Sequence, residues 1–512
     1  MGCRDSDIGD RPVVHPARSR LGECQSPFTP LSAVPSVEST MEEAAMKHKP
    51  KRARTSKPER GSLSLLERIQ PDAAGIDCGQ NSHYVAVPPD RDPERVREFR
   101  TFTADLQRLA DWLAQCRIKT VAMESTGVYW IPLYEILEAR GFEVLLVNAR
   151  DLHNVRGRKS DVADCEWLRE LHMVGLLHAS FRPAAALVPL RSYMRQRDTL
   201  VAEAATRIQR MQKALTEMNL MLHTVVTDIT GVTGLKILRD ILAGVRDPQR
   251  LALHRDHRCH ATAAELVAAL TGNYRAEHLF ALKQNFAAYE FLLKQIAQCD
   301  GAIEAALTTL AEQQAAPTGA LPAPRHTRPA PHGPKFEIRS PLHRFTGGVD
   351  LSQIDGIGPH SALQIIAEIG TDMSRWKSEK HFTSWLALAP NNKVSGGRRL
   401  SSRTLPSANR TAVILRRCAT SLGKTSTALG AFSRRLAARV GKAKAVTATA
   451  RKLALLIYRT LSGTLVYNDP GATAYHQLNR QRELKSLRKR AHLLGLNLLD
   501  RTTGELLVNP VS

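Results

Sequence analysis

The chain has 512 residues, enough for two or three domains that each have their own core. Its formal net charge of +23 and its pI of about 10.0 favour a polyanionic partner. No run of 18 apolar residues occurs, and the start of the chain lacks an apolar signal core, which argues against membrane and secreted proteins. The eight cysteines form no C-x-x-C pair, as is typical of reduced thiols.

Residues 1–70 contain many Pro and Ser, few aromatic side chains and the basic run "KHKPKRARTSKPER", which predicts a disordered basic extension. Residues 71–185 then alternate between strand and helix patterns. Strands are expected in "AAGIDCGQNSHYVAVPP" (two), "VREFRTFTA", "KTVAMEST" and "FEVLLVNA". Helices are expected at 105–116, at 128–139 and through "KSDVADCEWLREL". A strand meander followed by α/β crossovers predicts a mixed sheet, in the element order of a ribonuclease H-like (RuvC-like) domain.

Residues 186–315 are predicted to be helical and to contain a coiled-coil region. Apolar residues alternate at spacings of four and three, with one polar break at Arg197. This seam has two interpretations, an intramolecular helical hairpin or a dimerisation coiled coil, and its uninterrupted length favours the second. The seam consists of Leu190, Met194, Arg197, Val201, Ala204, Ile208, Met211, Leu215, Met218 and Leu222.

The stretch "HRDHRCH" brings together His254, His257, Cys259 and His260. A zinc site is one interpretation, but no second ligand pair stands at a matching spacing. We therefore favour a polar, basic loop.

Residues 316–340 are predicted to be a linker between domains, because 316–334 are Pro-rich and show no periodicity. Residues 341–470 are predicted to form a mostly helical C-terminal domain, and 471–512 a basic tail. Near the start of this domain, "DGIGPHSA" is typical of a helix-hairpin-helix, in which the turn at Gly356 and Gly358 points backbone N–H groups at a DNA phosphate. A helix-capping glycine turn has the same pattern.

Four carboxylates form the first candidate site. Asp77 lies near the end of the first predicted strand and Glu124 at the end of the fourth, and these strands are neighbours in a ribonuclease H-like sheet. Asp161 and Asp164 are three residues apart and share one helix face, which by itself is equally typical of an ordinary exposed face. Because clustered carboxylates repel one another, we predict that a divalent cation, Mg²⁺ or Mn²⁺, binds among them and clamps a phosphodiester.

A serine in a basic region forms the second candidate site. No Asp or Glu occurs from His381 to Asn468, and sixteen Lys or Arg lie between Ala389 and Arg459. Such a surface repels itself unless a polyanion covers it, and it has no carboxylate with which to build a metal site. Within it, "VSGGRRL" places Ser395 before two glycines and two arginines, namely Gly396, Gly397, Arg398 and Arg399. Ser395 is either a nucleophile on phosphorus or a hydrogen-bond donor in a phosphate-binding turn, and chemistry alone favours the second role.

The chain resembles the DEDD transposases of bacterial insertion sequences, the IS110 family and most closely its IS1111 branch. The resemblance covers roughly residues 70–470. It rests on several blocks in the family's order: "GIDCGQNSHYVAV", "AMESTGVYW", "VNARDLHNVRGRKSDVADCEWLRELH", "LRSYMRQRDTLV", "DITGVTGLKILRDILAGVRDP", "DGIGPHSALQIIAEIG" and "WLALAPNNKVSGGRR". The chain departs from the family's basic-Gly-Asn step, since Ser407, Ala408, Asn409 and Arg410 stand there.

The resemblance implies a RuvC-like domain, a coiled-coil region and a C-terminal transposase domain that recombine DNA. It implies that Asp77, Glu124, Asp161 and Asp164 are metal ligands and that Ser395 is the nucleophile. It also implies a bridge RNA that pairs with donor and target DNA, a homo-oligomer (dimer or tetramer), and composite sites in which the serine faces the RuvC-like site of another protomer. We expect DNA contacts at the glycines and arginines named above, Arg410 included, and a location in the bacterial cytoplasm with the nucleoid.

Two other functions are consistent with the same residues. A Holliday-junction-type nuclease would attack with metal-activated water, and Ser395 would only bind phosphate. A non-enzymatic nucleic-acid-binding scaffold would not need the carboxylates.

Overall fold

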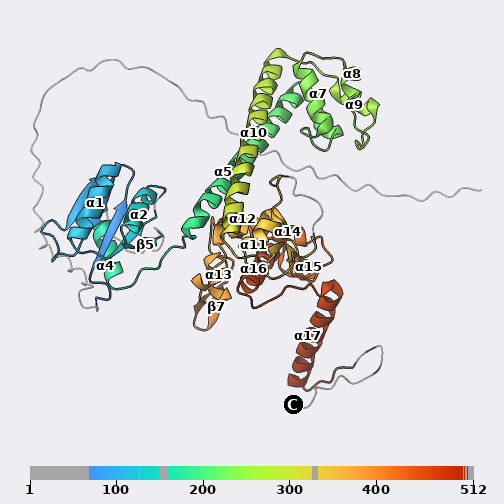
Figure 1. The fold of residues 1–512 in the computed structure, drawn as a ribbon. Coiled ribbons are helices and arrows are strands. Elements are labelled where there is room, and N and C mark those ends of the chain that lie inside the picture. The colour runs from blue at the N-terminus through green and yellow to red at the C-terminus, as the bar shows by residue number, and fades with distance from the viewer. Residues whose placement is uncertain are drawn as a thin grey trace, which may run out of the picture.

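The computed structural model describes residues 68–125, 127–148, 160–325, 332–499, 501 and 504 (Figure 1). The predicted disordered extension therefore lies outside the described residues, apart from its last three. No helix in these ranges is long and apolar enough to cross a membrane.

The N-terminal region contains a five-stranded mixed sheet, as predicted. The strands are β1 (Ala73–Cys78), β2 (Ser82–Ala86), β3 (Val96–Arg100), β4 (Thr120–Glu124) and β5 (Glu143–Val147), and their order in the sheet is β3-β2-β1-β4-β5. β1 pairs antiparallel with β2 and parallel with β4, and β4 pairs parallel with β5. The expected neighbourhood of the first and fourth strands is thus confirmed.

Helices cover both faces of this sheet because its central strands are apolar on both sides. Ile76 and Met123 belong to the core beneath α1 (Thr103–Gln115) and α2 (Trp130–Ala139). On the other face, α4 (Asp161–Met173) packs on β1 and buries Ala122 together with Leu168.

Two long helices form the middle of the molecule, and they correct our interpretation of the heptad seam. α5 (Val188–Glu217) and α10 (Ala276–Glu312) lie side by side in the same chain (Figure 1). They run antiparallel, since Leu190 near the start of α5 shares a core with Leu307 near the end of α10, whereas Met211 shares one with Leu282. The seam is therefore buried within one chain, as in the helical-hairpin interpretation, and it does not supply a dimer interface.

The polar break in the seam is a buried ion pair. Arg197 Nε lies 2.5 Å from Asp300 Oδ1 on α10, and Arg197 Nη1 donates to the His332 carbonyl at 2.9 Å. The Asp300 carboxylate compensates the buried charge of Arg197, which explains why an arginine is compatible with an apolar seam. Removing one partner would leave the other charge buried without compensation.

Short helices cap the far end of the α5–α10 pair. They are α6 (Leu222–Val225), α7 (Val232–Leu242), α8 (Pro248–Ala252) and α9 (Ala263–Leu270), and they share a core with the two long helices. The His/Cys stretch lies between α8 and α9, where His254 pairs with Asp240 at 2.6 Å and the Cys259 thiol donates to the Val225 carbonyl at 3.5 Å. These separate partners support the polar-loop interpretation over the zinc site.

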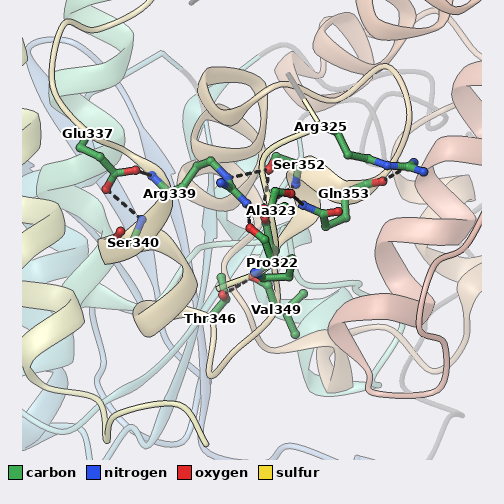
Figure 2. A network of polar contacts seen from close by, with 11 residues as sticks. Pro322, Ala323, Arg325, Glu337, Arg339, Ser340, Thr346, Val349, Ser352 and Gln353 are labelled. Carbon is green, nitrogen blue, oxygen red and sulfur yellow. Dashed lines mark hydrogen bonds and ion pairs between the residues drawn. The ribbon is translucent and has the colours of Figure 1, made fainter. Parts of the chain in front are cut away.

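The Pro-rich segment is bound along the C-terminal domain rather than acting as a spacer. Arg339 Nη2 donates to the Pro322 carbonyl at 2.7 Å, and Gln353 Nε2 donates to the Ala323 carbonyl at 3.0 Å. Arg325 lies 2.9 Å from Asp355. Figure 2 shows the contacts of Pro322 and Ala323 in this network, which holds the segment up to residue 325; residues 326–331 lie outside the described residues.

The C-terminal domain is mostly helical, as predicted, and shares one apolar core with the start of α5 and the end of α10. The boundary that we predicted at 316–340 therefore does not separate two cores. The elements of this domain are α11 (Arg339–Phe345), η3 (Leu351–Gln353), α12 (Pro359–Ile369), η4 (Met373–Arg375), α13 (Glu379–Trp385), β6 (Lys393–Ser395), β7 (Arg398–Ser401), α14 (Arg410–Leu422), α15 (Ala428–Val440), α16 (Lys442–Leu461) and α17 (Gly471–Leu493).

Two adjacent residues connect the sheet domain to the C-terminal domain. Phe181 stacks on Trp376, with ring centroids 4.9 Å apart, and lies edge-on to Trp385 at 5.1 Å. The guanidinium of Arg182 lies 3.9 Å from the ring centroid of Tyr134 on α2 and 3.4 Å from the Glu138 carboxylate. We call Phe181 and Arg182 the joint.

Candidate active site

Asp77 and Glu124 lie side by side at the carboxyl ends of β1 and β4. The parallel register pairs Gly75 with Ala122 and Ile76 with Met123, so the next step places Asp77 opposite Glu124. Side chains alternate between the two faces of a strand, which puts both carboxylates on the α4 face together with Gly75. The placement predicted from the strand pattern is therefore confirmed.

Gly75 sets how closely α4 approaches the sheet. A Cβ atom at this position would lie 2.3 Å from both the Cys165 carbonyl oxygen and the Arg169 nitrogen, so only glycine allows this contact. The Gln70 N–H donates to the Met173 carbonyl at 2.9 Å, which shows that α4 runs antiparallel to β1.

The N-terminal turn of α4 brings the other two carboxylates to the same end. Asp161 lies four residues before Cys165, which is about 6 Å along the helix axis. Asp77 lies two residues after Gly75, which is a similar distance, about 6.6 Å, along the strand. Asp161 therefore comes over Asp77, and Asp164 follows in the same turn. The Ser160 side chain caps the helix by accepting from the Ala163 N–H at 3.4 Å, and the acids lie at the favourable end of the helix dipole.

The crowding of these carboxylates is visible at Asp77. Burial and, to a smaller extent, the negative charges of Glu124, Asp161 and Asp164 together raise the pKa of Asp77 to about 7. Glu166, on the same helix, lies off this cluster and pairs with Arg95 at 3.1 Å.

The donor set fits a hard divalent cation. Two cysteines flank the carboxylates, but burial raises the pKa of Cys78 well above its usual value and that of Cys165 to about 12. Both therefore remain thiols at neutral pH and leave carboxylate oxygens as the available ligands, which suits Mg²⁺ or Mn²⁺. In the described ranges, no three Asp, Glu, His or Cys side chains are already arranged to hold a metal ion, so the carboxylates would have to draw together around one.

Ser395 lies at the tip of an exposed two-stranded hairpin, which the sequence analysis did not predict. It pairs with Arg398 across a two-residue loop, in which Gly396 has φ +52° and Gly397 has φ +74°. Positive φ at both loop residues is typical of a type I′ turn, which favours glycine or asparagine at these positions. All residues from Lys393 to Leu400 are exposed, and no atom lies within 4 Å of where a Cβ would stand on either glycine. A phosphate therefore has open access to the serine.

The glycine turn before α12 is more compact than a helix-hairpin-helix. Its predicted first helix is only the single 3-10 turn η3. Gly356 has φ +82°, and a Cβ there would lie 2.6 Å from the Leu422 side chain, so packing against α14 explains this glycine. Gly358 caps α12, and no atom lies within 4 Å of where its Cβ would stand, so its side of the turn remains open.

Arg410 begins α14 beside a pair of acids. It lines a small cavity of about 170 Å³ together with Asp198 and Glu368. Asn409, next to it in the departure from the family pattern, caps α14 by accepting from the Ala412 N–H at 3.1 Å. Glu368 already pairs with Arg191 and Arg195, and Arg417 lines the same cavity, so the contact of Arg410 with DNA stays a prediction.

The carboxylates and the serine do not meet within one chain. Figure 1 shows the β6–β7 hairpin apart from the five-stranded sheet. The sequence analysis missed Gly75 and the joint, which hold these parts in place. A glycine inside an apolar strand was an available signal for a close backbone approach.

Two family models match the chain. Residues 74–220 match a model named for the DEDD transposases of IS110 and described as a transposase, and this match contains all four carboxylates. Residues 350–425 match a model described as the transposase IS116/IS110/IS902 family, and this match contains the glycine turn and Ser395. No curated protein matches the chain.

Proposed function

Because the chain belongs to the DEDD transposases of the IS110 family, we propose that it cuts and rejoins the DNA of an insertion sequence with a serine nucleophile and a carboxylate-bound divalent cation. The observation that carries the proposal is the crowding of four acids at one end of the sheet, where burial and the neighbouring negative charges raise the pKa of Asp77 to about 7. Ionised carboxylates this close together repel one another, and a bound cation would remove that repulsion, so the arrangement favours a functional metal site.

Asp77, Glu124, Asp161 and Asp164 would hold Mg²⁺ or Mn²⁺. A cation in this position neutralises charge on the phosphodiester and stabilises the attacking and leaving oxygens. The residues of the chain supply the rest of the arrangement: β1 and β4 fix two carboxylates, and the capped first turn of α4 brings the other two.

Ser395 would attack the scissile phosphate. A bond forms between Ser395 Oγ and phosphorus while the bond from phosphorus to one deoxyribose oxygen breaks, which leaves a phosphoserine link to one strand end. Attack by a strand hydroxyl on that link then rejoins DNA and releases the serine. Arg398 and Arg399 on the same hairpin would neutralise phosphate charge during both steps.

We further propose that the active site is composite and guided by RNA. The hairpin carries no carboxylate and lies apart from the sheet of its own chain, which supports a site formed with the carboxylates of another protomer, in a dimer or tetramer. A bridge RNA is supported by the family resemblance and by the acid-free basic surface, and it would pair with donor and target DNA. A protein with these partners would act at the nucleoid in the bacterial cytoplasm.

A covalent-trapping experiment tests the nucleophile. Purified protein with MgCl₂, DNA carrying the element ends and any guide RNA should give an adduct that resists denaturation, and Ser395→Ala should abolish it. Ser401→Ala, at the base of the same hairpin, is the matched control and should keep the adduct.

The alternatives predict different results. An adduct that persists in Ser395→Ala would contradict the nucleophile assignment. Free cut ends at full rate in that variant would instead support a junction nuclease that uses activated water. If Asp77→Asn and Glu124→Gln leave the activity of the protein in cells unchanged, the result would support a non-enzymatic scaffold.

A further inference from the structure

The last described helix, α17, projects from the C-terminal domain (Figure 1). None of its 23 residues, all of them within the described part of the chain, is buried. Its first turns rest on α15, where Tyr475 lies edge-on to Phe432 at 6.4 Å and accepts from Arg435 Nε at 3.1 Å. The rest of the helix is therefore held away from any core, which is unusual for a helix of this length.

The charge on α17 is almost entirely positive. Its only acid is Glu483, which already pairs with Arg435 at 3.4 Å. Residues three and four apart face each other on a helix, so the cations at 482, 485 and 489 repel one another. A bound polyanion would offset this repulsion, so the helix favours binding to one. The cations are Arg480, Arg482, Lys485, Arg488, Lys489 and Arg490.

The positive surface continues onto α16. Burial lowers the pKa of Lys452, and the nearby charges of Arg482 and Arg459 lower it further. Lys452 and Arg482 therefore lie close enough to oppose each other, although they belong to different helices. This surface lies beyond residue 425, outside both stretches that match the family models.

We propose that α17 is a sequence-independent binding arm for duplex DNA. An α-helix about 10–12 Å wide fits the major groove of B-form DNA, about 12 Å wide, whereas the major groove of A-form RNA is too narrow to admit it. From Arg480 to Arg490 the helix rises about 15 Å, a length over which a duplex presents roughly nine phosphate charges.

Self-association is the less favourable use of this helix. Leu487 and Leu494 are 49% and 71% exposed and offer apolar surface to a second copy. Two such helices would, however, each bring six cations and one acid into the contact, and like charges oppose it. The choice of DNA rests on the proposed function, while the positive surface itself does not.

A salt-dependence experiment tests this arm. Arg482→Gln, Lys485→Gln and Lys489→Gln are combined in the full-length protein, and binding to a random-sequence duplex DNA is measured by fluorescence anisotropy in EDTA at 50–300 mM salt. Each lost phosphate contact should reduce the slope of log K against log salt by about 0.9, so a reduction of about 2–3 is expected. Gln keeps the helix propensity, which circular dichroism checks.

The matched control removes three exposed cations elsewhere, with Arg250→Gln, Lys283→Gln and Lys294→Gln, and should leave the slope unchanged. Equal slopes in the α17 variant and the wild type would overturn the proposal. So would a loss of duplex-RNA binding with DNA binding intact, or a smaller oligomer in sedimentation with an unchanged DNA slope. Because the assay contains no metal and needs no cleavage, failure of strand cleavage in the wild type would contradict the proposed function and leave this inference standing.

Discussion

The carboxylates of the sheet and the serine of the hairpin are held in opposite ways. Asp77 is half-buried, two residues after the close contact between Gly75 and the α4 backbone. Its neighbours therefore fix both its position and its pKa. Ser395 is exposed on a loop that contacts little else and is surrounded by cations. The first group is packed and crowded with negative charge, whereas the second is accessible and lies among positive charges.

This difference indicates what each site needs. The carboxylates need a cation, and the hairpin needs the phosphates of a nucleic acid. The rigid site should therefore respond strongly to small changes in packing, charge and pH, whereas the hairpin should tolerate changes that keep its turn and its cations.

The strongest contrast is between two acids on the same helix. Asp164→Asn should lower strand cleavage by about 10²–10³-fold, because a lost cation ligand removes about 3–4 kcal/mol of transition-state stabilisation. Glu166→Gln, two residues further on, removes only the ion pair with Arg95 and should leave cleavage within twofold of wild type. Cleavage rates at saturating MgCl₂ measure both effects. Equal losses of cleavage in the two variants would contradict the assignment of Asp164, rather than Glu166, to the metal-binding face of α4.

Glycine substitutions should separate a packed position from an open one. Gly75→Ala places a Cβ against the α4 backbone and should lower the free energy of unfolding by about 1–3 kcal/mol. Gly396→Asn meets no atom within 4 Å and keeps a residue suited to a type I′ turn, so its cost should stay near about 0.5 kcal/mol. Urea denaturation followed by circular dichroism measures both changes.

Asp77 should contribute to the pH dependence of stability with a sign opposite to that of the buried histidines. Asp77 has its pKa raised to about 7 in the folded protein, while the unfolded chain has a value near 3.8. Between these values the folded state keeps a proton on Asp77 that the unfolded state has lost, so the contribution of Asp77 to metal-free stability falls as the pH rises from about 4 to 7. Burial lowers the pKa of three histidines to about 4, and their contribution rises over this range; they are His83, His172 and His360. The carboxyl is partly open to solvent, so we expect a fall on the order of 1–2 kcal/mol.

Thermal unfolding in EDTA across this range measures that fall. Asp77→Asn should lack the contribution of Asp77, so the difference between its profile and that of the wild type isolates this fall, and Ser395→Ala should leave the profile unchanged. MgCl₂ should stabilise the wild type more at pH 8 than at pH 5, because ligands must be deprotonated. A profile that Asp77→Asn does not alter would show that another group titrates.

The smallest expected effect concerns the joint. Arg182→Ala removes the contact with the Tyr134 ring and the ion pair with Glu138, worth about 0.5–1 kcal/mol in this partly exposed setting. The expected result is a greater range of distances between spin labels placed on α2 and α13, with the melting temperature almost unchanged. Arg108→Ala, which removes an ion pair with Asp105 within α1, should leave the label distances as they are.

Much of the sheet domain could be predicted from the sequence, because alternating apolar strands and acids at strand ends are local patterns. Asp77, Glu124, Asp161 and Asp164 were placed together for that reason. The partner of the α5 seam could not be predicted, since periodicity reports an apolar stripe and not what covers it. Phe181 and Arg182 carried no signal, because their partners lie far along the chain and only the folded structure brings them near.

The joint has a consequence for how the chemistry can be assembled. Phe181 packs near Trp385, ten residues before Ser395, and Arg182 grips the helix that follows Glu124. Bringing the hairpin onto the carboxylates of its own chain by a movement of the whole C-terminal domain would break the aromatic stack. In the composite site proposed above, docking onto the carboxylates of a second chain would leave both contacts intact, so the joint would hinder a single chain from cutting DNA alone.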